Sequence, residues 1–352
     1  MTDLRVPSAL TELLGIRHPI VLAPFGGLSS VALTAAVSEA GGLGSYGLYG
    51  YDGERIRATA AALREATAAP FSLNIWLPTG DEVLPGPEHD GYAAALEAFF
   101  TEVGLEPSAR PERYLPSLDE QLDAIWEASP AVLSVVFGVP SGALVEEAHR
   151  RGIRVVGTAT TVAEAVALAE GGVDAIVATG AEAAGHRVSF LKPAEESLVG
   201  LVSLLPQVAD AVDVPVIAAG GIGDRRGVAA AFALGASGVQ VGTSFLATAE
   251  SAANEAHRGA IRSTAADASV LTRAMSGRLS RGAPNRAVRE IEASGAIAPF
   301  PAQNWLTGRF RAVAGQRGLG ELQSLWLGQS APLARWDTAS EVFAELLAGV
   351  PA

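Results

Sequence analysis

Short, continuous apolar runs alternate with alanine-rich segments of helical character along most of this 352-residue chain, and this alternation constrains its fold. The runs have the length of strands, and they are apolar throughout rather than at every second residue. Such continuous hydrophobicity is typical of parallel strands that are buried on both faces. Eight runs alternating with helices predict an α/β protein with a (β/α)8 TIM-barrel fold. The predicted strands are Pro19–Phe25, Leu43–Tyr46, Phe71–Leu77, Val132–Phe137, Arg154–Gly157, Ala175–Ala178, Pro215–Ala219 and Gly238–Val241.

Helices are predicted between these strands from their composition and their end signals. Ser30 is a candidate N-cap for a helix over Ser30–Ala40, and two glycines, Gly41 and Gly42, are stop signals after it. The other predicted helices are Glu54–Ala68, Ser117–Ala128, Ala143–Arg151, Ala163–Glu170 with Thr161 as its cap, Glu196–Ala211 and Arg226–Leu234. A doubly wound sheet is the alternative fold, but no strand is followed by a G-x-G-x-x-G motif with a downstream acid.

Two segments depart from the β/α rhythm. The segment Pro78–Pro116 is rich in proline, glycine and acidic residues, with one helical patch near Tyr92–Val103. We interpret it as an insertion after the third strand and a candidate lid. Residues 248–352 form a helical, arginine-bearing C-terminal extension that we expect to pack near the barrel mouth. The barrel is therefore assigned to residues 1–77 and 117–247.

The composition excludes several kinds of chemistry. There is no cysteine, so disulfides, thiolate nucleophiles and cysteine-ligated metals are ruled out. We expect a cytoplasmic protein, since the composition fits a reducing compartment and the N-terminus does not have the pattern of a signal peptide. The net charge of −13 disfavours binding to nucleic acid. Lys192 is the only lysine, so Schiff-base chemistry would require it. No motif indicates a metal site.

Two further stretches need an interpretation. The stretch Arg273–Arg289 contains five arginines. It is either a solvated surface segment, as charge patterning favours, or a local site for an anionic substrate or cofactor. The stretch Gly227–Ala249 has no charged residue, but glycines and polar residues interrupt it. We interpret it as a helix, a glycine turn and a buried strand rather than as a membrane span.

Glycines at the ends of the seventh and eighth predicted strands indicate a phosphate site. The seventh strand leads into Gly220 and Gly221, and the eighth contains Gln240 and Val241 before Gly242 and Thr243. Glycines allow backbone N–H groups to approach an anion closely, and the loops after strands seven and eight are the usual phosphate site of such barrels. The alternative is that these are plain turn glycines. The phosphate would belong to a cofactor or to a substrate.

His186 is the candidate catalytic residue. It follows the sixth predicted strand in a segment of glycines and small residues, on the face where barrel active sites lie. A neutral imidazole can accept or deliver a proton near pH 7. The other four histidines lie away from the carboxyl ends of strands. Glu182 in the same segment either orients a partner or caps the turn that follows.

Polar and small residues on the first and third strands are candidate ligand contacts. Asn74 lies within an apolar strand, where an amide must be hydrogen-bonded or it costs stability. It is either a satisfied structural residue or a ligand contact. The turn at Ala23, Pro24 and Phe25 either lays backbone along a flat ring or is a tight βα turn with a core phenylalanine.

These segments together resemble the nitronate monooxygenase family of FMN-dependent TIM-barrel flavoenzymes. The resemblance spans nearly the whole chain in the family order. It rests on the segments LLGIRHPIVLAPFGG, SEAGGLGSYG, FSLNIW, SVVFGVPS, GTATTVAEA, VDAIVATGAEAAGHRVSFL, VPVIAAGGIGDRRGVAAAFALGASGVQVGTSFL and SLWLGQSAPLAR. The segment around EAAGHR, with the following GGI and GTSFL segments, is specific to this family and its near relatives.

The resemblance implies a role for each matching residue. It places His186 at the catalytic histidine, and it implies FMN contacts for Asn74, Thr179 and Ala184 and for the phosphate-binding residues. Those phosphate-binding residues are Gly221, Gln240, Val241, Gly242 and Thr243. The sequence departs from the family pattern at Leu22 and Phe25 beside the expected flavin ring, at Val188 after the histidine, and at Thr179 and Ala184. These departures reshape the substrate pocket more than the FMN site.

The function implied is oxidation of alkyl nitronates with O2 through a flavin semiquinone. His186 would hold the anionic nitronate or, with a neutral nitroalkane, remove its α-proton. One alternative is an FMN-dependent reductase that uses NAD(P)H on a quinone or an enoyl thioester. A flavin-binding sensor or subunit without turnover is another, and a barrel that binds a phosphosugar without flavin is a third. We expect a monomer or homodimer.

Overall fold

The computed structural model describes residues 8–107 and 109–352. Eight parallel strands form a barrel in the order β1-β9-β8-β6-β5-β4-β3-β2. A parallel bridge between Val21 and Leu43 closes β1 against β2. The predicted (β/α)8 fold is confirmed. The strands are β1 (Ile20–Leu22), β2 (Gly44–Gly47), β3 (Phe71–Trp76), β4 (Val132–Val136), β5 (Arg154–Ala159), β6 (Ala175–Thr179), β8 (Val216–Ala219) and β9 (Gly238–Val241).

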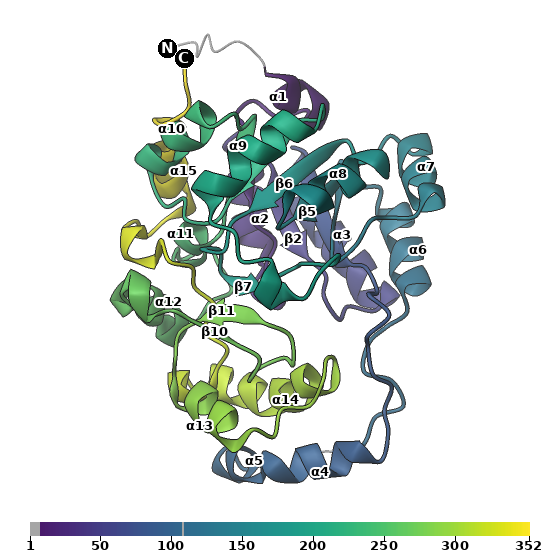
Figure 1. Ribbon diagram of the computed structural model, residues 1–352, viewed down its shortest axis with the longest axis vertical. Coiled ribbons are helices and arrows are strands. Elements are labelled where there is room, and N and C mark those ends of the chain that lie inside the picture. Colours follow the sequence, from purple (N-terminus) through teal and green to yellow (C-terminus); the bar gives the residue numbers. More distant parts are fainter. Residues whose placement is uncertain (1–7, 108) are drawn as a thin grey trace.

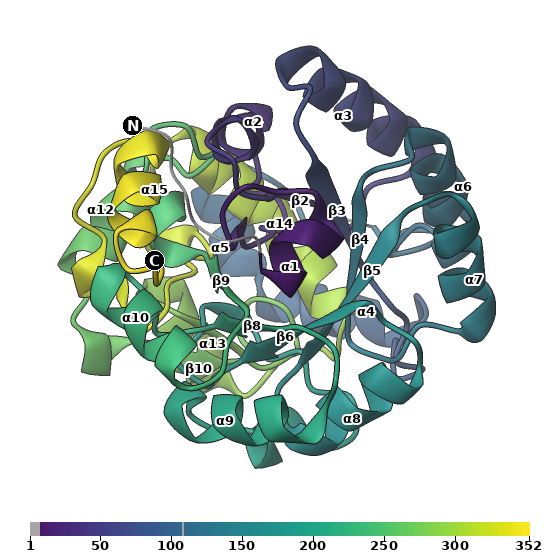
Figure 2. The same cartoon turned by 90° about the horizontal axis from the view of Figure 1, so that it is seen from above.

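Helices surround the barrel on all sides (Figure 2). Polar caps begin many of them, as predicted for Ser30, whose hydroxyl accepts the N–H of Leu33. The outer helices are α2 (Val31–Glu39), α3 (Gly53–Ala66), α6 (Leu118–Ala128), α7 (Gly142–Arg150), α8 (Val162–Glu170), α9 (Leu201–Ala211), α10 (Arg225–Ala233) and, late in the chain, α15 (Ala339–Leu347). Helix α15 packs against α2 and α10, so the C-terminal segment completes the ring of helices.

The N-terminal end of the barrel is filled by α1 (Ala9–Leu14), which lies at the centre of the view in Figure 2. Leu10 and Leu14 pack there in a cluster with Val21, Val156 and Ile217 from the strands. The larger core lies between the strands and the outer helices. Because the N-terminal end is closed by apolar side chains, a ligand site is left to the opposite, C-terminal end.

A separate cap covers that C-terminal end (Figure 1). It combines the insertion with most of the C-terminal extension, and the two share an apolar cluster that includes Phe99, Phe100 and Phe310. The helices of this cap are α4 (Glu88–Ala95), α5 (Glu97–Glu102), α12 (Glu255–Ser263), α13 (Arg286–Ser294) and α14 (Ala302–Gln316). The short helix α11 (Thr243–Leu246) and four 3-10 turns, η1 (Ala194–Glu196), η2 (Ala266–Ala268), η3 (Gly320–Leu322) and η4 (Ala331–Leu333), complete the described helical elements.

Three parts of the secondary structure differ from the sequence prediction. The helix predicted from Glu196 begins only at Leu201, because the glycine at position 200 and the turn η1 precede it. The helical patch of the insertion begins earlier than predicted and is two short helices, α4 and α5. The C-terminal extension is not purely helical: β10 (Val270–Thr272) and β11 (Ser280–Gly282) form an antiparallel sheet with β7 (Gly185–His186). Isolated three-residue strands leave little periodic signal in a sequence.

Within the described residues, every helix is too short or too polar to cross a membrane.

Candidate active site

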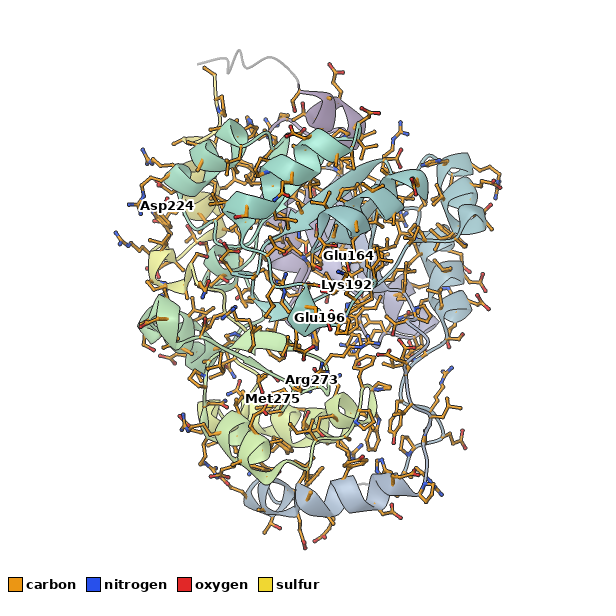
Figure 3. The ribbon with its side chains drawn as sticks, viewed as in Figure 1. Glu164, Lys192, Glu196, Asp224, Arg273 and Met275 are labelled. Atoms are coloured by element: carbon orange, nitrogen blue, oxygen red, sulfur yellow. The ribbon has the colours of Figure 1, made fainter. Side chains whose placement is uncertain are left out.

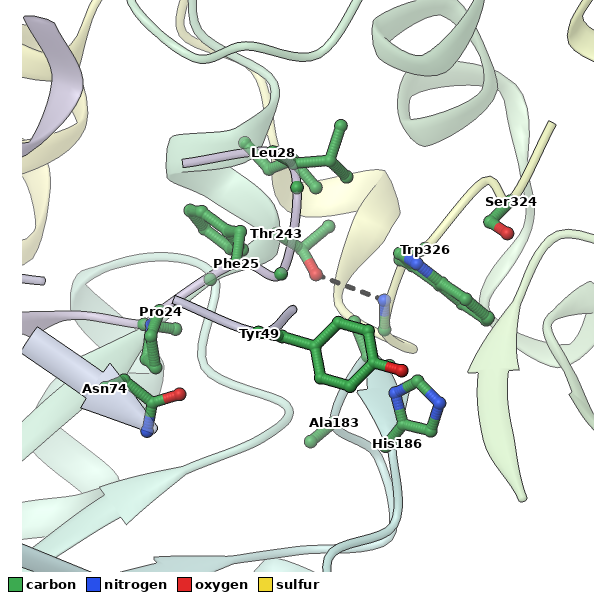
Figure 4. Close-up of a pocket in the computed structure, with 18 of the residues that line it drawn as sticks. Pro24, Phe25, Leu28, Tyr49, Asn74, Ala183, His186, Thr243, Ser324 and Trp326 are labelled. Carbon is green, nitrogen blue, oxygen red and sulfur yellow. Dashed lines mark hydrogen bonds between the residues drawn. The ribbon is translucent and has the colours of Figure 1, made fainter. Parts of the chain in front are cut away.

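The C-terminal ends of the strands and the cap together enclose a cavity of about 760 Å³ (Figure 4). This volume falls within the roughly 300–1,000 Å³ of small-molecule and cofactor sites. The barrel contributes the floor of the cavity, and the cap contributes its roof. Floor residues from the strand ends include Ala23, Asn74, Ser134, Thr158, Thr179, Ala219 and Gln240.

One side of the floor is made of small residues and backbone. Gly220 and Gly221 both have positive φ angles, of 95° and 71°, which L-residues with side chains rarely adopt. Gly242 and Thr243 line the same side. The Thr243 hydroxyl accepts the N–H of Gly328 at 3.1 Å (dashed in Figure 4). The structure thus brings the predicted glycines together, and it adds Gly328 from the C-terminal segment.

Val241 is the exception among the predicted phosphate residues. Its side chain is buried in the core between the strands and helices and does not line the cavity. Its carbonyl accepts the N–H of Ala23 at 3.0 Å, which extends the pairing of β1 with β9. Any role of Val241 toward a ligand is therefore restricted to its backbone or to holding Ala23.

The floor is flat and neutral beside the first and third strands. Ala23, Pro24 and Phe25 line the cavity, and Phe25 also packs on the core. The Asn74 amide nitrogen donates to the Ser134 hydroxyl at 2.8 Å and to its carbonyl at 3.2 Å. These bonds orient the amide, so its oxygen is turned toward the cavity in Figure 4. Asn74 is therefore both satisfied and available to a ligand.

His186 lies on β7, where the cap meets the barrel. Its Nε2 atom lies 2.8 Å from the Ser276 hydroxyl, and that hydroxyl donates to the carbonyl of Arg278 at 3.1 Å. Because the Ser276 hydroxyl donates its proton to that carbonyl, it can only accept from His186. Nε2 therefore carries a proton and donates a hydrogen bond to Ser276. Nδ1 then has the free lone pair. The ring packs against Trp76, with centroids 4.8 Å apart, and against Trp326 at 5.6 Å.

Burial, together with the smaller effect of the positive charges of Arg278 and Arg311, lowers the pKa of His186 to about 3. Removing an imidazolium from water is unfavourable, and like charges nearby disfavour it again. The ring is therefore neutral through the physiological range. It retains accessible surface only as part of the cavity wall, deep below the protein surface.

Several buried polar groups hold the segment around His186 in place. Arg187 is buried and donates to the carbonyls of Gly180 at 2.8 Å and Thr179 at 3.1 Å. Glu164, buried in the barrel, accepts the N–H of Phe190 at 2.6 Å (Figure 3). A carboxylate that accepts backbone N–H groups fixes a loop without secondary structure. The segment is thus anchored on both sides of the histidine.

Two residues in this region act differently from a ligand contact. The Glu182 carboxylate accepts the N–H of Leu201 at 2.9 Å, so it caps the start of α9, 19 residues further along the chain, rather than the turn that directly follows it. Lys192 is exposed and does not line the cavity (Figure 3). Schiff-base chemistry in the cavity is therefore ruled out for the only lysine.

The basic stretch combines surface and buried residues. Arg273, Arg286 and Arg289 form ion pairs near the surface. Arg281 is buried and donates to the carbonyl of Ala181 at 3.1 Å. The prediction of a solvated surface segment is therefore wrong for part of the stretch, because all three residues of β11 are buried between the cap and the barrel segment that carries β7.

Arg278 is the second buried arginine of this stretch and ties the insertion to the C-terminal extension. Its guanidinium lies 3.9 Å from the ring centroid of Phe300, and it donates to Thr79 at 2.6 Å, Asp81 at 2.6 Å and Glu82 at 3.0 Å. Cation–π contact and ion pairing together stabilise a desolvated guanidinium. One side chain thus connects the start of the insertion with the roof above His186.

Sequence reasoning missed most of the roof. His257 was set aside because it lies far from any strand end, yet it lines the cavity and its Nε2 lies 2.8 Å from the carbonyl of Trp326. Tyr49, Trp76, Asn304 and Arg311 also line the cavity. Trp76 is the last residue of β3 and Tyr49 lies shortly after the end of β2, and these positions were an available signal. Nothing local marks Asn304 or Arg311, which reach the cavity only because α14 packs over the barrel.

Comparisons with known proteins agree on one family. The family model described as nitronate monooxygenase matches residues 7–349. A probable nitronate monooxygenase of Staphylococcus aureus (strain JH9) is 37% identical over 345 residues, which cover 96% of each chain. The crystal structure of nitroalkane oxidase from Streptomyces ansochromogenes has a TM-score of 0.83 at 36% identity, covering 96% of this chain and 98% of that one. FabK from Thermotoga maritima has a TM-score of 0.77 at 29% identity, covering 97% and 96%.

The barrel, with its cavity at the C-terminal mouth and a neutral histidine in the wall, together with these relatives, defines an enzyme of the oxidoreductase class. The chain belongs to the nitronate monooxygenase family.

Proposed function

We propose that the cavity binds FMN and that the enzyme oxidises alkyl nitronates with O2. The floor fits a flavin mononucleotide. A Cβ at Gly242 would lie 3.3 Å from the Cβ of Ala23 and 3.5 Å from the Phe25 ring, so a side chain there would fill the cradle. Backbone N–H groups near Gly221 and the Thr243 hydroxyl suit a phosphate. Ala23, Pro24 and the amide oxygen of Asn74 suit a flat heterocycle.

Bound FMN would supply the electron-transfer chemistry, and the protein would supply position and electrostatics. Gly220, Gly221, Gln240 and Thr243 would hold the phosphate end. Thr179 and Ala184, which line the cavity between the floor and His186, would contact the cofactor chiefly through their backbones. Val241 would keep Ala23 in place.

The observation that carries the choice of substrate is a neutral histidine in a cationic, aromatic chamber. Arg278 and Arg311 place positive charge near His186, while Trp76 and Trp326 exclude water from its ring. Within the described residues, Glu182 is the one carboxylate that lines the cavity, and it already caps α9. Such a chamber favours a small planar anion with a short alkyl group. A nitronate has this shape and charge.

His186 would act on the substrate through Nδ1. Toward a nitronate, the neutral ring positions the anion and packs beside it. Toward a neutral nitroalkane, Nδ1 would accept the α-proton, and the imidazolium would then donate from Nε2 to Ser276. The depressed pKa makes this base weak, so we expect preformed nitronates to be better substrates than nitroalkanes.

An NAD(P)H-dependent reductase is the second candidate, and one observation favours it. Two buried donors, Nε of Arg311 and Nε2 of Gln323, have no partner within the described residues. Both side chains line the outer part of the cavity, near the exposed residues Ala312 and Gln316. Phosphate oxygens of a nicotinamide nucleotide would satisfy them. FabK, similar over nearly the whole chain, keeps this candidate open.

One spectroscopic experiment separates these candidates. The purified protein is expected to be yellow, or to become yellow with added FMN, and anaerobic ethylnitronate should bleach the flavin within one turnover. Bleaching by NADH alone, with no response to nitronate, would favour the reductase. A protein that stays colourless with added FMN would contradict both. We further propose a cytoplasmic monomer or homodimer, which sedimentation and fractionation would test.

A further inference from the structure

The hydroxyl of Tyr49 lies in the cavity wall below the roof, close to His186 (Figure 4). Tyr49 follows β2, and the backbone of the preceding residue, Leu48, donates to the carbonyl of Asn74 at 2.9 Å. Its ring packs on Trp76, with centroids 4.2 Å apart, and Trp76 in turn contacts His186 at 4.8 Å. Figure 4 shows the Tyr49 hydroxyl and the His186 ring pointing into the same part of the cavity. The two side chains therefore face one ligand.

A chain of hydrogen bonds fixes the direction of the tyrosine proton. The Arg311 guanidinium donates to Oδ1 of Asn304 at 2.8 Å, and Nδ2 of Asn304 donates to the Tyr49 hydroxyl at 2.9 Å. Because a guanidinium can only donate, the amide cannot be turned the other way. The tyrosine oxygen is thus an acceptor from Asn304. Within residues 8–107 and 109–352, its own proton has no acceptor, so it is available to a ligand in the cavity.

Burial determines the protonation states of Tyr49 and Arg311 in this chain of hydrogen bonds. Desolvation raises the pKa of Tyr49 well above its ordinary value, so the hydroxyl keeps its proton at any physiological pH. Burial lowers the pKa of Arg311 only to about 10, so the guanidinium stays charged. No carboxylate of the described residues lies within ion-pair distance of Arg311, whereas Arg278 has two such partners. A buried cation without a counter-charge favours an anionic ligand nearby.

We propose that Tyr49 is a catalytic residue that donates its hydrogen bond to the anionic oxygen of the substrate, next to His186. Asn304 and Arg311 are positioning residues, which orient the hydroxyl and place positive charge behind it. This inference rests on the proposed function, because it takes the substrate to be a planar anion. It gives the two neighbouring side chains different roles: the histidine acts at the substrate carbon, and the tyrosine holds the substrate oxygen.

The first test is Tyr49→Phe in the FMN-loaded enzyme, with isobutyrate as an unreactive planar anion. Binding is followed by the change in flavin absorbance. A hydrogen bond to a charged group is lost, so we expect isobutyrate to bind about 10- to 100-fold more weakly. The kcat/KM for a nitronate should fall by a similar factor, while FMN stays bound. Tyr92→Phe, which removes a hydroxyl outside the cavity, is the matched control and should change neither quantity.

The second test shows whether Asn304 acts through Tyr49. Asn304→Leu should weaken isobutyrate binding about 5-fold when Tyr49 is present and have almost no effect in the Tyr49→Phe background. An equal effect in both backgrounds would limit Asn304 to a structural role and overturn the relay.

The outcomes separate this inference from the proposed function. Unchanged isobutyrate binding and unchanged nitronate turnover in Tyr49→Phe would overturn the inference and leave the function intact. Weakened isobutyrate binding in Tyr49→Phe, together with a wild-type enzyme that does not oxidise nitronates, would support Tyr49 as an anion donor and reject nitronate as the substrate. A wild-type enzyme that neither binds isobutyrate nor oxidises nitronates would overturn both.

Discussion

The floor and the roof of the cavity are built in different ways. The floor is made of glycines and backbone groups from neighbouring strand ends, and Gly220, Gly221 and Gly242 have no side chain that could clash or carry charge. The roof is made of long side chains from distant segments, with Arg311 as a cation in the lining and Arg278 behind it. The floor is therefore suited to a cofactor, whereas the roof determines which substrate can approach that cofactor.

The two regions also differ in what holds them in shape. The floor is held by the parallel hydrogen bonds of the barrel, which continue from β1 to β9 and β8. The roof is held by side-chain contacts between the insertion and the C-terminal extension, such as Arg278 with Asp81 and Arg286 with Glu102. We therefore expect the roof to loosen before the floor does, and the following predictions test this contrast.

The largest expected effect is on chemistry at the roof. His186→Asn removes the basic nitrogen, so kcat/KM for a neutral nitroalkane should fall by about 100-fold or more, the usual contribution of a general base. The effect on a preformed nitronate should be nearer 10-fold, because no proton is removed. Steady-state rates with both forms of one substrate measure this difference. FMN content, measured by absorbance, should not change. Unaltered nitroalkane turnover would reject His186 as the base.

The next effect is on cofactor binding at the floor. Gly242 has φ −113° and ψ −73°, so a side chain is tolerated by its backbone, but it would enter the cradle. Gly242→Val should weaken FMN binding by about 10- to 100-fold through steric overlap. Titration of the flavin-free protein measures the affinity. Gly142→Val is the control, because nothing lies within 4 Å of its added Cβ. Equal FMN affinity in the two variants would place the phosphate elsewhere.

A stability effect should distinguish the roof from the floor. Arg278→Met removes the connection to Asp81 and Glu82 and the cation–π contact, so the free energy of unfolding should fall by about 2 kcal/mol. Arg286→Met, which breaks an exposed pair with Glu102, should cost less than about 1 kcal/mol. Urea titrations measure both changes. Limited proteolysis of Arg278→Met should cut first near residues 78–86, and cleavage first within the barrel would contradict the contrast.

The pH dependence of stability should report the buried histidine. The pKa of His186 is about 3 in the native protein and 6.5 when unfolded, so the unfolded chain binds more protons between these values. The contribution of His186 to the free energy of unfolding has its full value above pH 6.5. It decreases by about 1 kcal/mol per pH unit as the pH falls. Burial lowers the pKa of His257 too, which adds a slope of the same sign. In urea titrations of the flavin-free protein, His186→Asn should lose less stability from pH 6.5 to 5. An unchanged slope would argue against a buried neutral ring.

The smallest effect concerns the cap alone. Gly91 lies within α4, is exposed, and nothing would contact an added Cβ. Gly91→Ala should raise the free energy of unfolding of the cap by about 0.5–1 kcal/mol, since glycine is unfavourable inside a helix. Hydrogen exchange of α4 measures it, and nitronate kinetics should stay the same. Altered kinetics would show that the insertion communicates with the site.

The fold could be predicted because its signals are local. Most strands are short apolar runs, although β2 has the sequence GSYG, and helix starts such as Ser30 and Thr161 are marked by side chains that cap them. The exceptions have a shared cause. The sheet of β7, β10 and β11 is made of two- and three-residue strands, which form only because segments far apart in sequence meet there. Strands of two or three residues are too short to show a repeating hydrophobic pattern in the sequence.

The candidate site could be predicted only in part, for the same reason. The glycines of the floor and His186 lie directly after strands, where a barrel places its ligands. Tyr49 and Trp76 lie close to the ends of β2 and β3 and were not among the predicted site residues. Arg311 and Asn304 had no signal, since their neighbours in sequence are ordinary helix residues.

The sequence by itself determined a closed parallel barrel, a glycine-rich floor and a histidine at its mouth. These features depend on hydrophobic runs and backbone freedom, which are properties of each short segment. Only the tertiary structure decided the charge and shape of the roof, because burial and proximity to Arg278 and Arg311 set the state of His186. Desolvation and Coulomb interaction depend on distances in space, and these arise only when the insertion and the C-terminal extension pack together over the barrel.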